Sequence, residues 1–218
     1  MKEYYDTKPE GYYRGQRPDL MRLIPKGTRS LLDVGCGEGG ASFDAKQLFD
    51  LEFTAGIELF EDAAEKAREV LDEVLTINIE QTPLPYSDNK FDCILCADVL
   101  EHMIDPWASL RSLRRVLSPN GILIASIPNI ANLHVVKKII RDRFEYEENG
   151  ILDKTHLRFF TLHTIKKMFA DCGYEIVGID RNLSRNFFMQ FAYLWSFGYF
   201  KEGDTFQFLI TARKDSKK

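Results

Sequence analysis

The stretch LLDVGCGEGG, residues 31–40, joins an apolar run to a glycine-dense turn, and it constrains the fold more than any other part of the chain. Glycine adopts positive φ angles and lets a ligand approach the backbone closely. The stretch therefore predicts a strand that ends in a ligand-binding loop. Its spacing leaves the ligand open, because Gly35, Gly37 and Gly40 fit the GxGxxG pattern of dinucleotide-binding loops. Glu58 also follows where such folds place a ribose-binding carboxylate.

Charge in and beside the loop argues against a dinucleotide. A dinucleotide lays its pyrophosphate on the amides of the helix after the loop, and a nearby carboxylate would repel it. Asp33 ends the predicted strand and Glu38 lies inside the loop. These anions suit a ligand that is cationic near the loop and carries a ribose farther away. S-adenosylmethionine fits, with an ammonium, a sulfonium and no phosphate, while a nicotinamide cofactor is the alternative.

Length and composition are those of an ordinary globular protein. The 218 residues allow one α/β domain, predicted over residues 29–218, after an N-terminal flap and helix at 1–28. A net charge of -4 gives no electrostatic case for binding nucleic acid. Residues 1–30 lack the apolar core of a signal peptide, and no run approaches the ~20 apolar residues of a transmembrane helix. We therefore expect a cytoplasmic protein without a transmembrane segment.

The four cysteines do not predict a metal site. Cys93 and Cys96 share one predicted strand, and residues three apart on a strand point to opposite faces. The two thiols therefore cannot bind one ion without distortion. No acidic cluster of the kind that binds magnesium in catechol-type enzymes is evident either, so we expect no metal.

Apolar runs and helical patterns alternate along much of the chain, which is typical of a parallel sheet covered on both faces. The predicted strands are 30–34, 53–57, 74–79, 91–97, 122–127, 174–180 and 206–212. Helices are predicted after Gly40, over 61–73, from Pro106 to Leu117 and after Thr161, with a turn at 118–121. The carboxyl ends of parallel strands lie at one edge, where open α/β sheets bind ligands. The glycine loop, Glu58, Asn78 and Asp98 should therefore meet in one crevice.

Two segments interrupt this alternation. The first, at about 130–160, contains an amphipathic basic helix over 133–144, which is either a lid over the crevice or a plain surface helix. The second is an insert at about 182–204, with dense aromatic residues from 187 to 200. This segment could contact a hydrophobic acceptor, a second subunit of a homodimer or a membrane surface, or be buried in its own domain.

The N-terminal flap contains tyrosines and arginines near residue 15. Tyr13 or Arg17 could bind the carboxylate of a ligand, since arginine offers a fork of donors. Aromatic packing of this helix onto the sheet is the alternative.

Several motifs agree in order and spacing with one family. Residues 32–39, LDVGCGEG, are similar to the first motif of class I S-adenosylmethionine-dependent methyltransferases. Residues 58–59, 78–80 and 98–102 are similar to three later motifs, and residues 117–121 to the turn before the fifth strand. The resemblance runs from about Arg29 to the C-terminus and includes members linked to saccharide or small-molecule methylation.

This resemblance implies a Rossmann-like three-layer α/β sandwich with a mostly parallel seven-stranded sheet, the last strand antiparallel. It implies S-adenosylmethionine as methyl donor and S-adenosylhomocysteine as product. In the family pattern, the residue at the position of Asp33 contacts the amino end of the methionine part, and the acid at the position of Glu58 binds the ribose. The residues at positions 59 and 78–80 surround the adenine. Asn78 stands where the family more often has Asp. Its side-chain carbonyl can still accept a hydrogen bond from the adenine amino group, but we expect a lower affinity for the cofactor. The implied cofactor-binding residues are Asp33, Gly35, Cys36, Gly37, Gly39, Glu58, Leu59, Asn78, Ile79, Glu80 and Asp98, with Tyr13 and Arg17 from the flap.

Methyl transfer to a hydroxyl requires the removal of a proton. His156, in a segment DKTHLRF that resembles methyltransferases of cell-envelope saccharide synthesis, is the first candidate for the base. His102, just after the fourth strand, is the second, and both could instead be structural.

The acceptor is left open between two chemistries. Asn129, Asn132 and Arg158 could read a sugar, whereas the aromatic segment could bind a quinone-like molecule. From other classes, an NAD(P)-dependent oxidoreductase and a cofactor-binding protein without chemistry remain alternatives.

Overall fold

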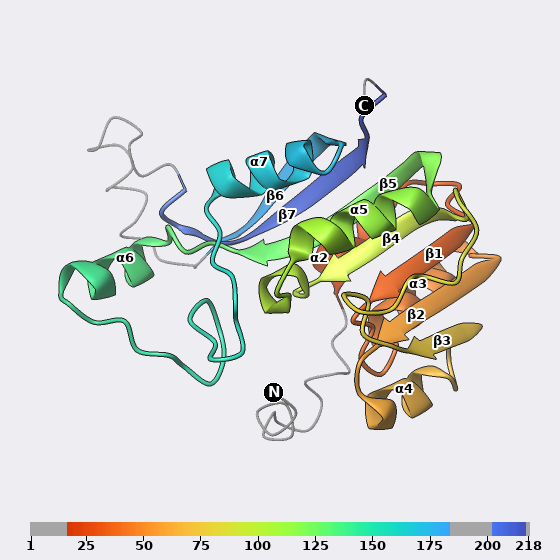
Figure 1. Ribbon diagram of the computed structural model, residues 1–218, viewed down its shortest axis with the longest axis horizontal. Coiled ribbons are helices and arrows are strands. Elements are labelled where there is room, and N and C mark those ends of the chain that lie inside the picture. Colours follow the sequence, from red (N-terminus) through yellow and green to blue (C-terminus); the bar gives the residue numbers. More distant parts are fainter. Residues whose placement is uncertain (1–16, 184–201, 217–218) are drawn as a thin grey trace.

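Seven strands pair into a single sheet in the computed structural model, which describes residues 17–183 and 202–216 (Figure 1). The strands are β1 (Ser30–Val34), β2 (Phe53–Glu58), β3 (Glu73–Thr76), β4 (Phe91–Ala97), β5 (Leu117–Pro128), β6 (Tyr174–Leu183) and β7 (Thr205–Lys214). Their order is β3-β2-β1-β4-β5-β7-β6. β7 is antiparallel to both neighbours, and the other pairs are parallel. The predicted fold class, a Rossmann-like α/β sandwich with an antiparallel last strand, is confirmed.

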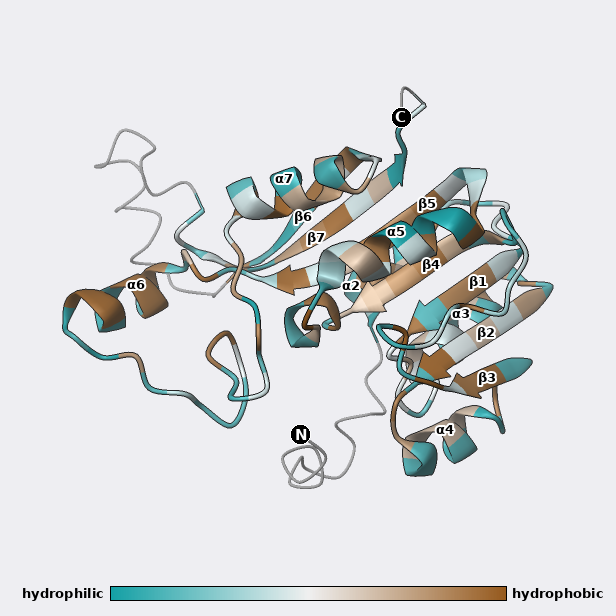
Figure 2. Ribbon diagram, viewed as in Figure 1, coloured by the Kyte–Doolittle hydropathy of each residue, from teal (hydrophilic) through white to brown (hydrophobic). Residues whose placement is uncertain are grey.

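Helices cover both faces of the sheet. The described helical elements are α2 (Pro18–Met21), α3 (Gly40–Phe49), α4 (Glu61–Ala67), the 3-10 turn η2 (Leu100–His102), α5 (Pro106–Val116), α6 (Leu133–Ile140) and α7 (Leu162–Asp171), and α6 stands away from the sheet (Figure 1). α5 and α7 pack on one face, in a core that includes Leu32 and Cys96. α2 and α3 pack on the other, in a core that includes Leu31 and Cys93. Figure 2 shows the apolar strands between these layers.

Alternation along each strand explains why neighbouring residues enter different cores, since successive side chains point to opposite faces. Cys93 and Cys96 follow this rule and lie in the two separate cores, as the strand spacing predicted. Both thiols are fully buried and free.

The helix predicted over 61–73 is wrong in its length, because α4 ends at Ala67. The N–H groups of Val70 and Leu71 both donate to the Ala67 carbonyl, and Leu71 packs beside Cys36. Pairing with β2 requires β3 to begin at Glu73, opposite Ala55. The chain must therefore turn before the helical pattern ends. β3 itself stops at Thr76, three residues earlier than predicted.

The turn predicted at 118–121 lies within the bounds of β5. Phe91 pairs with Leu117 and Cys93 with Ile122, so two steps along β4 face five along β5. The extra residues form an irregularity in the ladder rather than a separate turn. A Cβ on Gly121 would lie 2.7 Å from Cδ1 of Leu117, 2.8 Å from Oγ of Ser118 and 3.0 Å from the Asp92 carbonyl oxygen, so a side chain there would force its neighbours to move.

The interrupting segments are described in part. Residues 1–16 of the flap and 184–201 of the aromatic insert lie outside the described residues, so the predicted interface there stays a prediction. α2 packs Leu20 and Met21 into the core. α6 begins at the Asn132 cap, whose side chain accepts from the His134 N–H, and ends at Ile140 rather than 144. Among the described helices, none has the length and apolar content needed to cross a membrane.

The start of α7 gives a test of the local structure. Thr161 and Thr164 form a reciprocal capping box, far along the chain from the glycine loop. We expect Thr161→Ala to lower the free energy of unfolding by about 1 kcal/mol, because an N–H at the helix start loses its acceptor. Urea denaturation measures this. Thr161→Ser retains the hydroxyl and should stay close to the parent, and equal losses in both variants would contradict the cap.

Candidate functional site

A cavity of about 460 Å³ opens at the carboxyl ends of the strands. It is lined by the ends of β1, β2 and β4 and by the segment that follows β3. β1 lies between β2 and β4, so the chain direction across the sheet reverses here. This is the switch point at which open α/β sheets bind their ligands. The volume is in the range of sites for small molecules and cofactors.

Most residues predicted for the site line this cavity. They are Arg17, Asp33, Gly35, Cys36, Gly37, Glu58, Leu59, Asn78, Ile79, Glu80, Asp98 and His102. Gly39 and His156 are not among the lining residues, and Tyr13 lies outside the described part. The sequence reasoning missed Val34, Ala41, Ile57, Phe60, Ile77, Gln81, Ala97, Val99, Met103 and Ile104. Most of these are direct neighbours of predicted residues, which is the signal that could have found them.

The glycine loop approaches other parts of the chain too closely for side chains. Gly35 has a φ of 68°, and a Cβ there would lie 2.7 Å from Cγ2 of Val99. Gly39 caps α3 with a φ of 82°, and a Cβ there would lie 2.9 Å from Cγ2 of Val70. Gly39 therefore shapes the loop from behind instead of lining the cavity.

The Glu58 carboxylate holds the loop in place. Its Oε2 accepts from the Gly37 N–H at 2.8 Å. Its Oε1 accepts from the N–H groups of Leu59 at 2.7 Å and Phe60 at 3.0 Å. Glu58 is almost fully buried yet lines the cavity. The Glu58 side chain thus joins the loop after β1 to the residues just before α4.

Asp33 is the second buried carboxylate at the loop. It is 2% exposed and accepts a 2.7 Å hydrogen bond from the Ser42 hydroxyl. Burial raises the pKa of Asp33 to about 6, against the lowering effect of the Ser42 bond and with a further rise from the charge of Glu58. The site therefore holds a carboxylate whose ionisation is costly until a cation lies beside it.

The structure pairs the second loop carboxylate, that of Glu38, with a lysine. Its Oε1 pairs with Lys66 Nζ at 2.7 Å, and Glu38 is not among the cavity-lining residues. A lysine from α4 thus neutralises this anion on the outer side of the loop. The carboxylates among the described lining residues are those of Asp33, Glu58, Glu80 and Asp98.

Polar side chains in the segment after β3 accept hydrogen bonds from backbone N–H groups. Oδ1 of Asn78 accepts from the Glu80 N–H at 2.9 Å, which closes a tight local turn. Oε1 of Glu80 accepts from the Asp105 N–H at 2.7 Å, so this segment is tied to the beginning of α5. Ile77 and Ile79 from the same segment line the cavity.

Arg17 reaches the cavity from the N-terminal side of α2. Its guanidinium donates to both carboxylate oxygens of Asp19 at 3.0 Å and also binds Asp98. Gln207 on β7 donates to the other oxygen of Asp98. Asp98 has a φ of 55°, a strained conformation for a non-glycine residue. Burial raises the pKa of Asp98, and the Arg17 charge opposes this rise.

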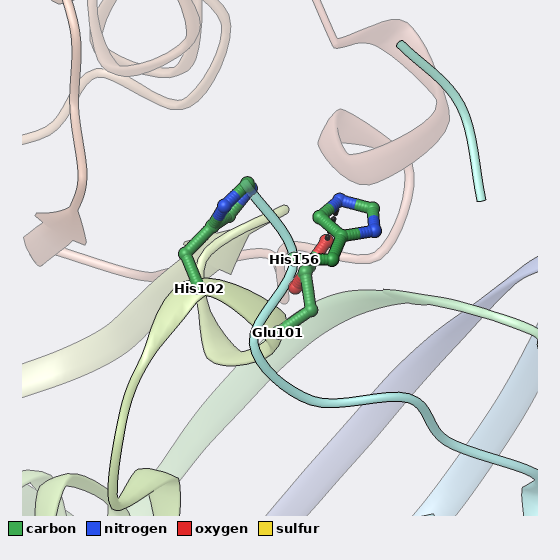
Figure 3. Close-up of side chains that lie close together, drawn as sticks. All are labelled: Glu101, His102 and His156. Carbon is green, nitrogen blue, oxygen red and sulfur yellow. Dashed lines mark ion pairs between the residues drawn. The ribbon is translucent and has the colours of Figure 1, made fainter. Parts of the chain in front are cut away.

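The two predicted histidines lie against one another (Figure 3). Their ring centroids are 4.8 Å apart, and His102 lines the cavity while His156 lies behind it, 7% exposed. Nε2 of His156 is 4.0 Å from Oε1 of Glu101. Glu101 is 1% exposed, and burial, together with the charge of Asp98, raises its pKa well above the usual range. The sequence reasoning did not single out Glu101, although it precedes His102 directly.

The polar residues proposed for sugar recognition are used elsewhere. Asn129 and Asn132 are fully buried, and their side-chain amides donate to the Thr205 carbonyl at the start of β7. The Arg158 guanidinium donates to the Ile104 carbonyl. No residue of the predicted lid, 130–160, is among the cavity-lining residues within the described part of the chain. This segment supplies His156, and its predicted role as a lid stays a prediction.

Comparison with known proteins gives a consistent family. A family model described as a methyltransferase domain matches residues 10–179. A probable S-adenosylmethionine-dependent methyltransferase of Mycobacterium tuberculosis is 32% identical over 180 residues, which cover 80% of this chain and 60% of that protein. A ubiquinone biosynthesis O-methyltransferase of Actinobacillus pleuropneumoniae is 31% identical over 139 residues, which cover 55% of this chain and 58% of that protein. The chain spans about half the length of the first curated relatives that it matches.

The fold also matches solved structures. An S-adenosylmethionine-dependent methyltransferase of Thermotoga maritima superposes with a TM-score of 0.67 at 21% identity, over 93% of this chain and 89% of that one. At this identity the likeness shows the fold alone.

The buried Asp33 carboxyl predicts an unusual pH dependence. Its folded pKa of about 6 lies above the ordinary 3.8, so the native state binds the proton more tightly. The stability that the protonated Asp33 carboxyl contributes is present below pH ~4 and is lost as pH rises through about 6. We expect Asp33→Asn to raise the free energy of unfolding at pH 7 by on the order of 1–2 kcal/mol, with no gain at pH 4.

Urea denaturation at several pH values, without added ligand, measures this effect. Glu65→Gln, at an exposed position on α4, removes one negative charge as a control and should change little. An Asp33→Asn protein less stable than the parent at pH 7 would contradict the assignment.

Proposed function

The chain belongs to the methyltransferase-domain family, and from this premise we propose that it transfers a methyl group from S-adenosylmethionine to an oxygen of a small-molecule or saccharide acceptor. Enzymes of this family use S-adenosylmethionine as methyl donor. The oxygen acceptor is supported by relatives named as O-methyltransferases, of which ubiquinone biosynthesis O-methyltransferase is one. A cytoplasmic location is part of the same proposal.

One observation carries the choice of cofactor: the charge of the cavity. Its described lining contains four carboxylates, those of Asp33, Glu58, Glu80 and Asp98, against the guanidinium of Arg17. Arg17 is already paired with Asp19 and Asp98. A pyrophosphate would therefore meet net negative charge, while a ligand with cationic groups would be stabilised. This disfavours the NAD(P)-dependent alternative.

The lining residues suit the parts of S-adenosylmethionine. Asp33, buried beside the loop, would bind the ammonium, and an arriving cation would favour its ionised form. Glu58 already accepts three N–H groups, and it lies where ribose hydroxyls would complete its coordination. Apolar side chains such as Leu59 and Ile79 would pack on the adenine.

Bound S-adenosylmethionine supplies a methyl group on an electrophilic sulfonium. The chain itself must orient the acceptor, exclude water and take up or release the hydroxyl proton. His102 lines the cavity beside Met103 and Ile104, so we place the acceptor oxygen at this end. The His156 ring contacts the His102 ring on the side away from the cavity. His156 would therefore affect the proton transfer through His102 and not by direct contact with the acceptor.

A lipophilic, quinone-like acceptor is the second candidate. The lining near His102 is apolar, with Val99, Met103 and Ile104, and offers few groups that read sugar hydroxyls. The relative named for ubiquinone biosynthesis supports the same chemistry. The aromatic segment 187–200, which could cover such an acceptor, lies outside the described residues.

Calorimetry tests the cofactor. We expect S-adenosylhomocysteine to bind and NAD or NADP to give no heat of binding. Glu58→Gln should weaken S-adenosylhomocysteine binding by about ten- to a hundredfold, because hydrogen bonds to a charged group contribute about 1.5–3 kcal/mol. Glu52→Gln, at an exposed glutamate before the opposite end of β2, is the matched control. Binding of NAD in place of S-adenosylhomocysteine would overturn the proposal.

Histidine variants test the proton step. Transfer of a radiolabelled methyl group can be followed with phenolic, quinol and saccharide acceptors. We expect His102→Ala and His156→Ala each to lower turnover about a hundredfold or more with any acceptor that the parent methylates. S-adenosylhomocysteine affinity should stay within a few fold for His156→Ala, since His156 does not line the cavity.

The chain contains four histidines, and the other two, His134 and His163, lie exposed on α6 and α7. Their alanine variants should keep the parental turnover. Near-parental turnover in both His102→Ala and His156→Ala would instead remove the histidines from the proton step and point to a nitrogen acceptor.

A further inference from the structure

Glu101 is an unsatisfied carboxylate inside the protein. It is 1% exposed, and within the described residues neither of its side-chain oxygens accepts a hydrogen bond. Isolated burial of a carboxylate is costly unless a cation or a proton accompanies it. A cation bound beside this carboxylate would lower that cost.

Two histidines surround the same point. The nearest nitrogen of His156, Nε2, is 4.0 Å from Oε1 of Glu101. One atom each from Glu101, His102 and His156 lies within 4.8 Å of the other two. Figure 3 shows Glu101 and His102 extending from one turn while His156 comes from a separate segment. Two ligands bonded to one ion in a tetrahedral site are about 3.4 Å apart, so the three side chains must approach one another by up to about 1.4 Å to bind one ion.

Backbone contacts set the tautomers of both rings. Nδ1 of His102 lies 3.1 Å from the Thr155 carbonyl oxygen, and Nδ1 of His156 lies 3.0 Å from the Ile151 carbonyl oxygen. A carbonyl oxygen only accepts, so each Nδ1 must carry the proton. In the neutral ring the lone pair is then on Nε2. This is the arrangement in which outer backbone groups orient metal-binding histidines.

The two segments are also joined firmly to each other. The Glu101 carbonyl accepts from the N–H groups of Leu157 and Arg158, both at 2.9 Å. Asp153, 3% exposed, accepts from the N–H and the hydroxyl of Thr155 and so shapes the loop just before His156. The three side chains are therefore held together before any ligand binds.

We propose that Glu101, His102 and His156 bind a divalent first-row transition ion at the acceptor end of the cavity. Two imidazoles and one carboxylate are ligands typical of zinc, iron(II) or manganese(II), whereas magnesium prefers an all-oxygen set. Three protein ligands leave positions open, as in catalytic metal sites. This replaces the expectation, drawn from the cysteines and the lack of an acidic cluster, that the chain binds no metal.

The use of the ion rests on the proposed function, although its binding does not. His102 belongs both to the cluster and to the cavity lining, so an open coordination position would face the acceptor. A hydroxyl oxygen bound there would lose its proton more readily, as metal-bound water does. The two histidines would then act on the proton step as ligands rather than as a free base.

Metal binding to the full chain tests the site directly. The protein is stripped with a chelator and titrated with Zn²⁺ by calorimetry and with Co²⁺ by visible absorption. We expect one equivalent of each to bind, with Co²⁺ bands of mixed nitrogen and oxygen coordination, and Mg²⁺ to bind far more weakly. Zn²⁺ should also raise the melting temperature.

Variants locate the ion. Glu101→Gln, His102→Gln and His156→Gln should each weaken Zn²⁺ binding at least tenfold, the least that loss of even an outer partner costs. His134→Gln and His163→Gln, at the exposed histidines, should bind like the parent. Circular dichroism and S-adenosylhomocysteine binding establish that the variants fold.

The outcomes separate this site from the proposed function. A parent that binds S-adenosylhomocysteine but no transition ion, or cluster variants that bind Zn²⁺ as the parent does, would overturn the metal site alone. Ion binding without S-adenosylhomocysteine binding would support the site and contradict the methyltransferase.

Discussion

The Glu58 carboxylate, held by three backbone N–H groups, is the contact on which the cavity depends. It joins Gly37 of the glycine loop to Leu59 and Phe60 after β2. These N–H groups belong to two separate chain segments, which this one carboxylate joins. A neutral side chain would accept fewer of them, so the charge of Glu58 stabilises the loop.

A second network joins parts of the chain that are remote in sequence. Arg17 before α2 and Gln207 on β7 both bind Asp98 at the end of β4. Asn182 on β6 donates to Asp19 and to Gln207, which brings the last two strands into the same network. The cavity wall therefore depends on both termini of the domain. The strained φ of Asp98 is kept because these partners over-determine its position.

Buried carboxylates recur along this edge of the sheet, and each is compensated differently. Glu58 has backbone donors, Asp98 has a guanidinium, and Asp33 has a single hydroxyl. Glu101 has no hydrogen-bond donor in the described part of the chain. The less the protein compensates a carboxylate, the more a cationic ligand gains by binding beside it. Asp33 and Glu101 are therefore the two carboxylates beside which a cationic ligand would stabilise the protein most.

Sequence alone located the strands along the chain, the glycine loop and the acids that follow the strands, because hydrophobic periodicity and turn residues act locally. The capping residues Asp105 and Thr161 were also readable, since each bonds an N–H three residues away. Tertiary structure decided which side chains face the cavity. Glu38 turns out to pair with Lys66, and α4 ends early because β3 must align with β2.

The same limit applies to the cluster of Glu101, His102 and His156. His156 is 54 residues after His102, and hydrogen bonds such as those from Leu157 and Arg158 to the Glu101 carbonyl, and the contact of His102 Nδ1 with the Thr155 carbonyl, bring the two segments together. No local pattern predicts such a contact, because its position depends on how the loop after α6 returns to β4. Sequence thus determined which chemical groups were present, and packing decided which of them meet.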